Sequence, residues 1–194
     1  RKDEQMMDEV VKDSMFELDN LSAYLVKVRE MTRADDEQTP LSVRLFNLSE
    51  TLEKLLRLTV IPVDKHVRFE TQLTPEQLWV AADSVHLTNS ISNLVENAIK
   101  YSGNEVCIRI SASLTEGKLV IQVADNGFGI SPQDQLHIFD KFYRSEQVID
   151  RSLPGIGLGL SYVKLMVEAH GGTVGVESIL GKGSVFTLEI PQSK

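Results

Sequence analysis

Hydrophobic residues recur along the first 34 positions at alternating intervals of four and three. This seam is apolar at six of its eight positions, which are Met7, Val11, Ser14, Leu18, Leu21, Leu25, Val28 and Thr32. Because the spacing is that of a heptad and no Gly or Pro interrupts it, we expect one long helix whose seam faces another helix. A terminal helix packed on its own domain is the alternative. The additional apolar side chains of Met15, Tyr24 and Met31 favour a dimeric helical bundle, since a lone helix would expose them to water.

A polar break separates this helix from the rest of the chain. Residues 35–40 are Asp-Asp-Glu-Gln-Thr-Pro, and the position before a proline disfavours helical backbone. We therefore place a boundary here. Residues 1–37 are expected to form the helix and its linker, and residues 38–194 a separate compact domain.

Beyond residue 38 the hydrophobic pattern alternates between the strand and helix periods. Asp83 is a suitable N-cap for a helix that runs to about Tyr101, and Glu116-Gly117 would close a β-hairpin. The pattern predicts helices at 49–59, 84–101, 132–139 and 159–169, and strands at 41–48, 67–72, 78–81, 106–114, 118–124, 173–178 and 184–190. This mixture, with antiparallel hairpins at the end, predicts an α+β fold. We expect a two-layer α/β sandwich with helices on one face of a mixed sheet.

Composition and charge exclude several classes of protein. The single Cys excludes a disulfide framework and a multi-cysteine metal site. No apolar run approaches the roughly 18–20 residues of a membrane span. The net charge of −8 is a poor match for nucleic acid. Residues 1–37 hold 11 acidic and 6 basic side chains, against 17 and 14 in residues 38–194, so the acidity is concentrated on the N-terminal helix.

A row of polar residues follows one side of the helix expected after Asp83. The members of this row, which is separate from the apolar stripe of the same helix, are Asn89, Asn93, Asn97 and Lys100. Asn is a mediocre helix former, so three on one side carry a propensity cost. A row of amide oxygens suits a hard cation, and the ammonium group at the end of the row suits a phosphate. A solvated helix side would also be polar, and these residues alone leave both interpretations open.

An apolar strand is expected to end in the motif Asp125-Asn-Gly127-Phe-Gly129. Asn-Gly is a strong turn signal, so a tight turn is one explanation of this motif. A carboxylate at Asp125 would lie at the edge of the sheet, where it could accept a hydrogen bond from an adenine amino group. Gly127 and Gly129 would let the backbone approach a ligand closely.

A second glycine-rich segment precedes the next expected helix. Three glycines alternate with other residues at 155–159, after a polar stretch at 145–154 that is typical of a lid. Glycines at a helix start can present backbone N–H groups to phosphate, although an ordinary loop would have the same pattern. Leu160 stands where a dinucleotide-binding motif has its third glycine, and the Gly-Lys-Gly at 181–183 lacks the spacing and hydroxyl residue of a P-loop.

Taken in order, these motifs resemble the boxes of sensor histidine kinases. The asparagine box corresponds to residues 93–101 (NLVENAIKY), the first glycine box to 125–130 (DNGFGI), the phenylalanine box to 139–144 (FDKFYR), the second glycine box to 155–160 (GIGLGL) and the closing glycine turn to 181–184 (GKGS). Four boxes in the right order are a specific signal. The fold of that family is the Bergerat ATP-binding sandwich shared with DNA gyrase, which agrees with the two layers expected above.

The resemblance implies a role for individual residues. Asn97 would ligate the Mg²⁺ that bridges the phosphates of ATP, and Asn93 would lie close to them. Asp125 would bind the adenine amino group. Lys100 and Arg144 would reach toward the phosphates and, together with Asn93, form the catalytic group. The other nucleotide contacts would come from Tyr101, Gly127, Gly129, Phe142, Gly155, Gly157, Leu158, Gly159, Leu160 and, through water on the adenine side, Thr187.

Position 93 separates this chain from its hydrolytic relatives. In gyrase-like ATPases the residue four before the Mg²⁺ ligand is a Glu that activates water. Here it is Asn93, which cannot take a proton at neutral pH. The resemblance therefore implies that the γ-phosphate is kept for transfer. Ile156 stands where the family more often has Thr, so a hydroxyl contact there is lost.

The usual phosphoacceptor of the family, a His followed by an acidic residue, has no counterpart in the chain. None of the four histidines precedes an acid or lies in the N-terminal helix; they are His66, His86, His137 and His170. We therefore expect the acceptor outside this sequence, and residues 1–34 to be the second helix of a dimerisation hairpin.

The resemblance implies a homodimer through that hairpin, a response-regulator receiver domain as partner, and no nucleic acid. It also implies a cytoplasmic part of an inner-membrane sensor, attached only through segments absent here.

Two other functions stay open on the sequence. An anti-sigma-type Ser/Thr protein kinase uses the same sandwich, but usually lacks a leader helix with heptads. A non-catalytic nucleotide-binding scaffold would act through the helix, and the intact Asn97, Lys100 and Asp125 argue against it.

Overall fold

A computed structural model describes residues 40–145 and 155–192 of the chain. The chain divides into two units, residues 1–39 and 40–194. The helix, linker and dimerisation surface expected in residues 1–37 lie outside the described residues, as does most of the lid expected at 145–154. In the part that the structure describes, no helix is long and apolar enough to cross a membrane.

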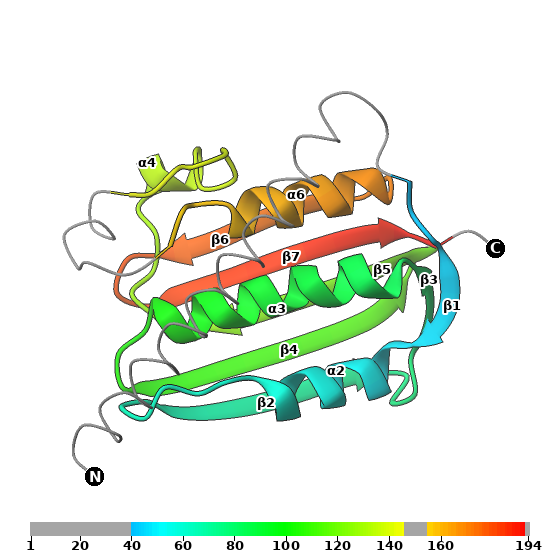
Figure 1. Cartoon of the computed structure of the whole chain (residues 1–194), viewed down its shortest axis with the longest axis horizontal. Coiled ribbons are helices and arrows are strands. Elements are labelled where there is room, and N and C mark those ends of the chain that lie inside the picture. The colour runs from blue at the N-terminus through cyan, green and yellow to red at the C-terminus, as the bar shows by residue number, and fades with distance from the viewer. Residues whose placement is uncertain (1–39, 146–154, 193–194) are drawn as a thin grey trace, which may run out of the picture. The chain divides into compact units, whose positions relative to one another are not determined.

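A five-stranded sheet forms one layer of the domain (Figure 1). The order is β2-β4-β5-β7-β6, in which β2 and β4 run parallel and the other neighbours antiparallel. Its strands are β2 (His66–Thr74), β4 (Glu105–Thr115), β5 (Lys118–Asp125), β6 (Thr173–Ile179) and β7 (Gly183–Pro191). A separate antiparallel pair joins β1 (Arg44–Asn47) to β3 (Trp79–Ala82). The large sheet is therefore mixed, as the sequence predicts.

Helices cover one face of this sheet and form the second layer (Figure 1). They are α2 (Leu48–Leu58), α3 (Ser84–Lys100) and α6 (Gly159–Ala169). The core lies between the layers, because alternate residues of the central strands meet the apolar sides of the helices. Its fully buried members include Leu87, Ile91, Leu94, Ile108, Ile110, Ile121, Val163 and Leu188. The predicted two-layer α+β sandwich is confirmed.

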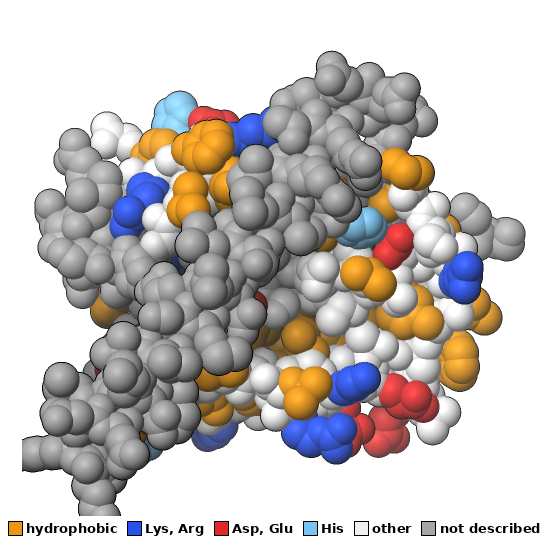
Figure 2. All heavy atoms as spheres, viewed as in Figure 1, with side chains coloured by type: hydrophobic (Ala, Val, Ile, Leu, Met, Phe, Trp, Pro, Cys, Tyr) orange, Lys and Arg blue, Asp and Glu red, His pale blue; other side chains and the backbone are white. Residues whose placement is uncertain are grey.

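The helix α2 shows how the hydrophobic pattern fixes the layer. Leu48 and Leu52 are buried against the core, while the charged residues of the helix are exposed. In the space-filling view, acidic and basic side chains gather around the position of α2 (Figure 2), and the charged residues of this helix, Glu50, Glu53, Lys54 and Arg57, are all exposed. One side of the helix therefore packs on the sheet and the other faces water.

The turn between β4 and β5 follows the chemistry expected of a two-residue hairpin. Glu116 and Gly117 have φ angles of 53° and 75°, and both therefore lie in the left-handed region that such turns require. Thr115 pairs with Lys118 directly across the turn. The hairpin predicted at this position is confirmed.

Two elements are shorter than the sequence predicts. The strand expected at 41–48 is β1, which spans only Arg44–Asn47; it ends at Asn47 because the side chain of that residue caps the start of α2. The helix expected at 132–139 is α4 (Pro132–Gln135). Beyond α4 the chain turns more tightly, since the His137 N–H donates to Asp134 O three residues back.

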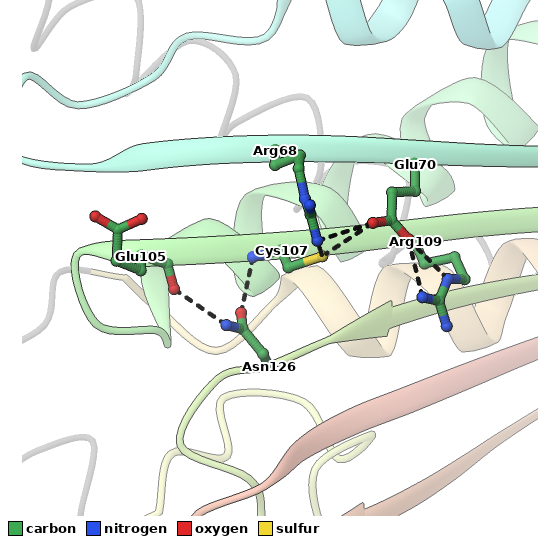
Figure 3. Close-up of polar contacts among 6 residues, drawn as sticks. All are labelled: Arg68, Glu70, Glu105, Cys107, Arg109 and Asn126. Carbon is green, nitrogen blue, oxygen red and sulfur yellow. Dashed lines mark hydrogen bonds and ion pairs between the residues drawn. The ribbon is translucent and has the colours of Figure 1, made fainter.

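The face of the sheet away from the helices carries a polar cluster on the parallel pair (Figure 3). Arg109 donates two hydrogen bonds to the Glu70 carboxylate, which also pairs with Arg68 at 2.9 Å. The guanidinium of Arg109, and then that of Arg68, holds the pKa of Glu70 below its usual range. Arg68 also donates to Cys107 Sγ at 3.5 Å. These contacts join β2 to β4 by side chains as well as by the backbone.

The start of α3 is fixed by Asp83. Its Oδ1 accepts hydrogen bonds from the N–H groups of Val85 and His86, at 3.0 and 3.1 Å, and its Oδ2 accepts from the Ser42 N–H at 2.8 Å. The Asp83 N–H in turn donates to His170 Nε2 at the end of α6. One residue therefore joins three segments that are distant in sequence.

Replacing Asp83 should expose this role through pH. Burial opposes ionisation of the carboxyl group, but the N–H donors outweigh it, so the pKa of Asp83 lies below its usual value. Stability from a depressed pKa is present above the unfolded value of about 3.9 and is lost as pH falls. Asp83→Ala should cost about 1–2 kcal/mol at pH 7, and less at pH 3. Urea unfolding at both pH values measures this, with Asp64→Ala in an exposed loop as control. An equal cost at both pH values would contradict the assignment.

Candidate functional site

The polar side of α3 meets the start of α6. Asn93 is buried, and its amide donates to Asn89 O at 2.7 Å. A side chain at Gly159 would place its Cβ 3.2 Å from Asn93 Oδ1 and 3.8 Å from Asn97 Nδ2. Two amides of the predicted row therefore lie beside the first residue of α6, and the exposed Asn89 contributes its backbone.

The first turn of α6 is open to an anion. Its N-cap residue is Leu158, and no side chain caps it among the described residues. Leu158 is buried and anchors the segment, while Leu160 is half-buried and packs against the core. The N–H groups of a first helical turn have no partner within the helix, and the helix dipole favours negative charge there.

Lys100, at the last position of α3, lies in the same region. A Cβ on Gly155 would come within 2.6 Å of Lys100 Nζ, so the second glycine box touches this ammonium group. Lys100 Nζ also lies 4.6 Å from the centre of the Tyr101 ring. Burial, and then the nearby charge of Arg144, lowers the pKa of Lys100 to about 8.

Arg144 completes a pair of neighbouring cations. Its charge acts on both Lys100 and Tyr101, and it opposes the rise in the pKa of Tyr101 that burial causes. Two like charges that are partly buried repel each other, and this repulsion contributes to the low pKa of Lys100. The structure therefore brings Lys100, Tyr101 and Arg144 together, as the sequence interpretation requires.

A carboxylate marks the other end of the site. Asp125, the last residue of β5, accepts hydrogen bonds from the N–H groups of Gly127 and Ser184 at 2.7 and 3.3 Å, both on Oδ1. Burial nevertheless raises the pKa of Asp125 above its usual range. Among the described residues this leaves Oδ2 for a ligand, and a half-buried acceptor of this kind suits an amino group.

The turn after Asp125 is held by side chains and by close packing. Asn126 accepts the Cys107 N–H at 2.8 Å and donates to Glu105 O at 3.1 Å, which ties the turn to β4 (Figure 3). A Cβ on Gly127 would lie 2.5 Å from Tyr101 O. Gly127 therefore has a structural reason to be glycine, namely the contact with the end of α3, that the sequence interpretation did not include.

The phenylalanine box joins the second glycine box through the backbone. Phe142 has a φ of 66°, which is rare for a side chain of this size, and its N–H donates to Gly157 O at 3.0 Å. Gly157 has a φ of 78°, and a Cβ there would lie 2.6 Å from Tyr143 O. Gly129, with a φ of 70°, packs on the Ile179 carbonyl. These residues shape the region between α4 and α6.

The structure does not bring Thr187 to this group. On β7 the residues that face the helices are Ser184, Phe186, Leu188 and Ile190, and Thr187 points to the opposite face. There it accepts a hydrogen bond from the Gln122 side chain at 3.3 Å. Ser184, which pairs in register with Asp125, lies on the helical face instead. The alternation of side chains along β7 is the signal that identifies Ser184, and the sequence interpretation did not apply it.

Lys65 is a second residue that the sequence interpretation missed. It lies in the loop before β2, and its ammonium group donates to Ile99 O and, at 2.9 Å, to Ser102 O. A cation at this position favours the negative end of α3 and satisfies its last carbonyls. The Phe128 N–H donates to Tyr101 O at 2.9 Å. The last turn of α3, which carries Lys100 and Tyr101, is thus fixed from two sides.

The chain matches a known protein family and several solved structures. The family described as Histidine kinase-, DNA gyrase B-, and HSP90-like ATPase matches residues 82–194. Sensor histidine kinase WalK of Bacillus subtilis is 40% identical over 130 residues, which are 66% of this chain and 21% of that protein. Sensor protein RprX of Bacteroides fragilis is 32% identical over 171 residues, 87% of this chain and 33% of that protein. The chain therefore spans about a fifth to a third of the length of these relatives.

Solved structures agree with the fold. Full-length ShkA in complex with AMPPNP has a TM-score of 0.78 and 26% identity, and covers 91% of this chain, which corresponds to 36% of that chain. Histidine kinase ThkA in complex with response regulator protein TrrA has a TM-score of 0.68 and 26% identity, over 91% of this chain and 49% of that one.

The low pKa of Lys100 should appear in the pH dependence of stability. An unfolded Lys titrates near 10.4, so between about pH 8 and 10 the unfolded chain binds more protons than the folded one. Stability should therefore rise with pH in this window, and Lys100→Met should remove that part of the slope. Urea unfolding from pH 7 to 10 without nucleotide measures it. Lys164→Met, at an exposed position of α6, is the control, and equal slopes in wild type and Lys100→Met would refute the shift.

Proposed function

The chain belongs to the family of histidine kinase-, DNA gyrase B- and HSP90-like ATPases and carries the ATP-binding catalytic domain of a sensor histidine kinase; from this we propose that it binds Mg-ATP and donates the γ-phosphate to a histidine in two-component signalling. The observation that carries the proposal is that α3 brings Asn93 and Asn97 beside Gly159, the first residue of α6, and Lys100 beside Gly155 in the segment that leads into α6. A half-buried carboxylate at Asp125, whose pKa is raised by burial, lies at the other end of the same region.

The two ends suit the two ends of ATP. Asp125 would accept the adenine amino group, while the open N-terminus of α6, Lys100 and Arg144 would hold the phosphates. The donor set fits a magnesium ion bound together with phosphate. Among the described residues no cluster of three His, Cys, Asp or Glu could hold a metal without it, and Mg²⁺ commonly takes only one or two protein ligands beside phosphate oxygens. Asn97 is the residue that we propose as its ligand, with Asn93 adjacent.

The residues near the phosphate end of the site favour transfer of the γ-phosphate over its hydrolysis. The amide of Asn93 cannot accept a proton from water, and its own N–H group is bonded to Asn89 O. Glu96, the nearest acid in the helix, is exposed and accepts a hydrogen bond from Ser92 at 2.9 Å. The proposed step breaks the bond between the γ-phosphorus and the oxygen that leaves with ADP and forms a bond to an imidazole nitrogen. Lys100 and Arg144 would stabilise the charge that the three phosphoryl oxygens carry during this exchange.

The proposed partners follow from this chemistry. A phosphohistidine would be passed to a response-regulator receiver domain, and ThkA, with 26% identity to this chain, has been solved with a response regulator. We also propose that the complete protein is a homodimer through its helical hairpin and that this domain faces the cytoplasm, where ATP is available.

Two substitutions test the phosphate end and the base end of the site independently. Asn97→Ala should abolish the dependence of ATP affinity on Mg²⁺, because the proposed ligand is removed. Asp125→Asn should reduce the preference for ATP over GTP by about tenfold, since a charged acceptor is lost. Titration calorimetry measures the first effect with ATP in the presence and absence of Mg²⁺, and the second with ATP and GTP in its presence. Asn89→Ala, exposed on the same helix, is the matched control. If both variants bind ATP as the parent does, the assignment is wrong.

Phosphotransfer can be tested with a partner supplied in trans. We expect the chain alone to bind labelled ATP without becoming labelled, because none of its four histidines resembles an acceptor. With the histidine-bearing dimerisation domain of a related sensor kinase, acid-labile label should appear on that domain. Arg144→Ala should slow the transfer more than it weakens ADP binding. Acid-labile label on a histidine of this chain would contradict the expectation.

A further inference from the structure

We propose that Ser178 is a positioning residue for nucleotide specificity, because it fixes the direction in which the Ser184 hydroxyl donates. The inference rests on the proposed function and concerns the base end of the site. Ser178 lies on β6, in register with Ser184 on β7, and Ser184 is in register with Asp125 on β5. The three residues therefore form one row across the sheet, on the face covered by the helices.

The Ser178 hydroxyl has three polar neighbours. The Ile130 N–H donates to its oxygen at 2.8 Å, and the hydroxyl donates to Gly183 O at 2.9 Å. Its oxygen also lies 3.0 Å from Ser184 Oγ. The Gln135 side chain donates to both Ser178 O and Ile130 O, at 3.0 and 2.8 Å, and so holds this part of β6 against α4.

Counting protons assigns the remaining contact. A backbone N–H can only donate and a carbonyl oxygen can only accept, whereas a serine hydroxyl has one proton to give. Ser178 gives that proton to Gly183 O. In the contact between the two serines, Ser184 must therefore be the donor and Ser178 the acceptor. The Ser184 oxygen is then left with lone pairs and no proton for a ligand.

This direction makes the base end of the site a group of acceptors. Ser184 is 6% exposed, and its N–H is bonded to Asp125 Oδ1, which keeps its side chain beside the carboxylate. A ligand that brings N–H donors, such as the amino group at position 6 of adenine, is favoured there. A purine with an oxygen at position 6 would place a third acceptor against the two already present, and nearby acceptors repel each other. Ser178 would thus add to the discrimination that Asp125 provides.

The test compares ATP with inosine triphosphate, which differs in the base at position 6 and in the protonation of the adjacent ring nitrogen. We expect Ser178→Ala to free the Ser184 hydroxyl, which can then donate to the oxygen of inosine. The ratio of the two affinities should fall by about threefold to tenfold, the value of one neutral hydrogen bond. Ser184→Ala should also lower the ratio, and adding Ser178→Ala to it should change the ratio no further. Ser178→Thr, which keeps the hydroxyl, is the control and should preserve the ratio.

Each outcome decides the proposal. Ser178→Ala that weakens both nucleotides equally would show a purely structural role and overturn it. If Ser178→Ala does not fold, Ser184→Ala alone decides, because an unchanged ratio there would show that the hydroxyl does not act on the base. A wild-type chain that fails to bind ATP would refute the proposed function instead, whereas binding that depends on Asp125 with no effect of either serine would refute only this inference.

Discussion

The placement of α3 is the constraint on which the rest of the structure depends. One side of this helix is buried in the core through Leu87, Ile91 and Leu94, and the other carries the amides and the ammonium group of the site. A rotation of the helix would disturb both. Asp83 fixes its start and Lys65 its end, so the sandwich positions the site by holding a single helix at its two ends.

Electrostatics is a second constraint on the candidate site. Lys100 and Arg144 lie together while partly buried, and the carboxylate of Asp125 is desolvated at the other end. In the proposed complex, the phosphates would lie near the cations and the N–H groups of the base near the carboxylate, so one ligand would compensate both charges.

Sequence alone predicted what depends on short-range pattern. The N-cap at Asp83, the Glu116-Gly117 turn and the two layers follow from periodicity and local chemistry, and the positions of Asn93, Asn97 and Lys100 on one side of α3 follow from helical spacing. Contacts between distant segments were not predictable. Lys65 lies 34 residues before Ile99, and nothing in its neighbourhood indicates a capping role. The resemblance assigns Thr187 to the base, but side chains alternate along β7 and that of Thr187 points to the face away from the helices. Ser184 occupies the position beside Asp125 instead.

The single parallel pair of the sheet has a consequence for how the domain responds to its ligand. His66 pairs with Glu105, and the chain between β2 and β4 makes the crossover that parallel neighbours need, with α3 as its helix. The element that carries the site is therefore also the connection that brings β2 to its place at the edge of the sheet. A nucleotide bound to α3 would therefore stabilise that edge against local unfolding, although β2 itself contributes none of the proposed contacts. Occupancy of the site and integrity of a remote strand are in this way linked through chain topology.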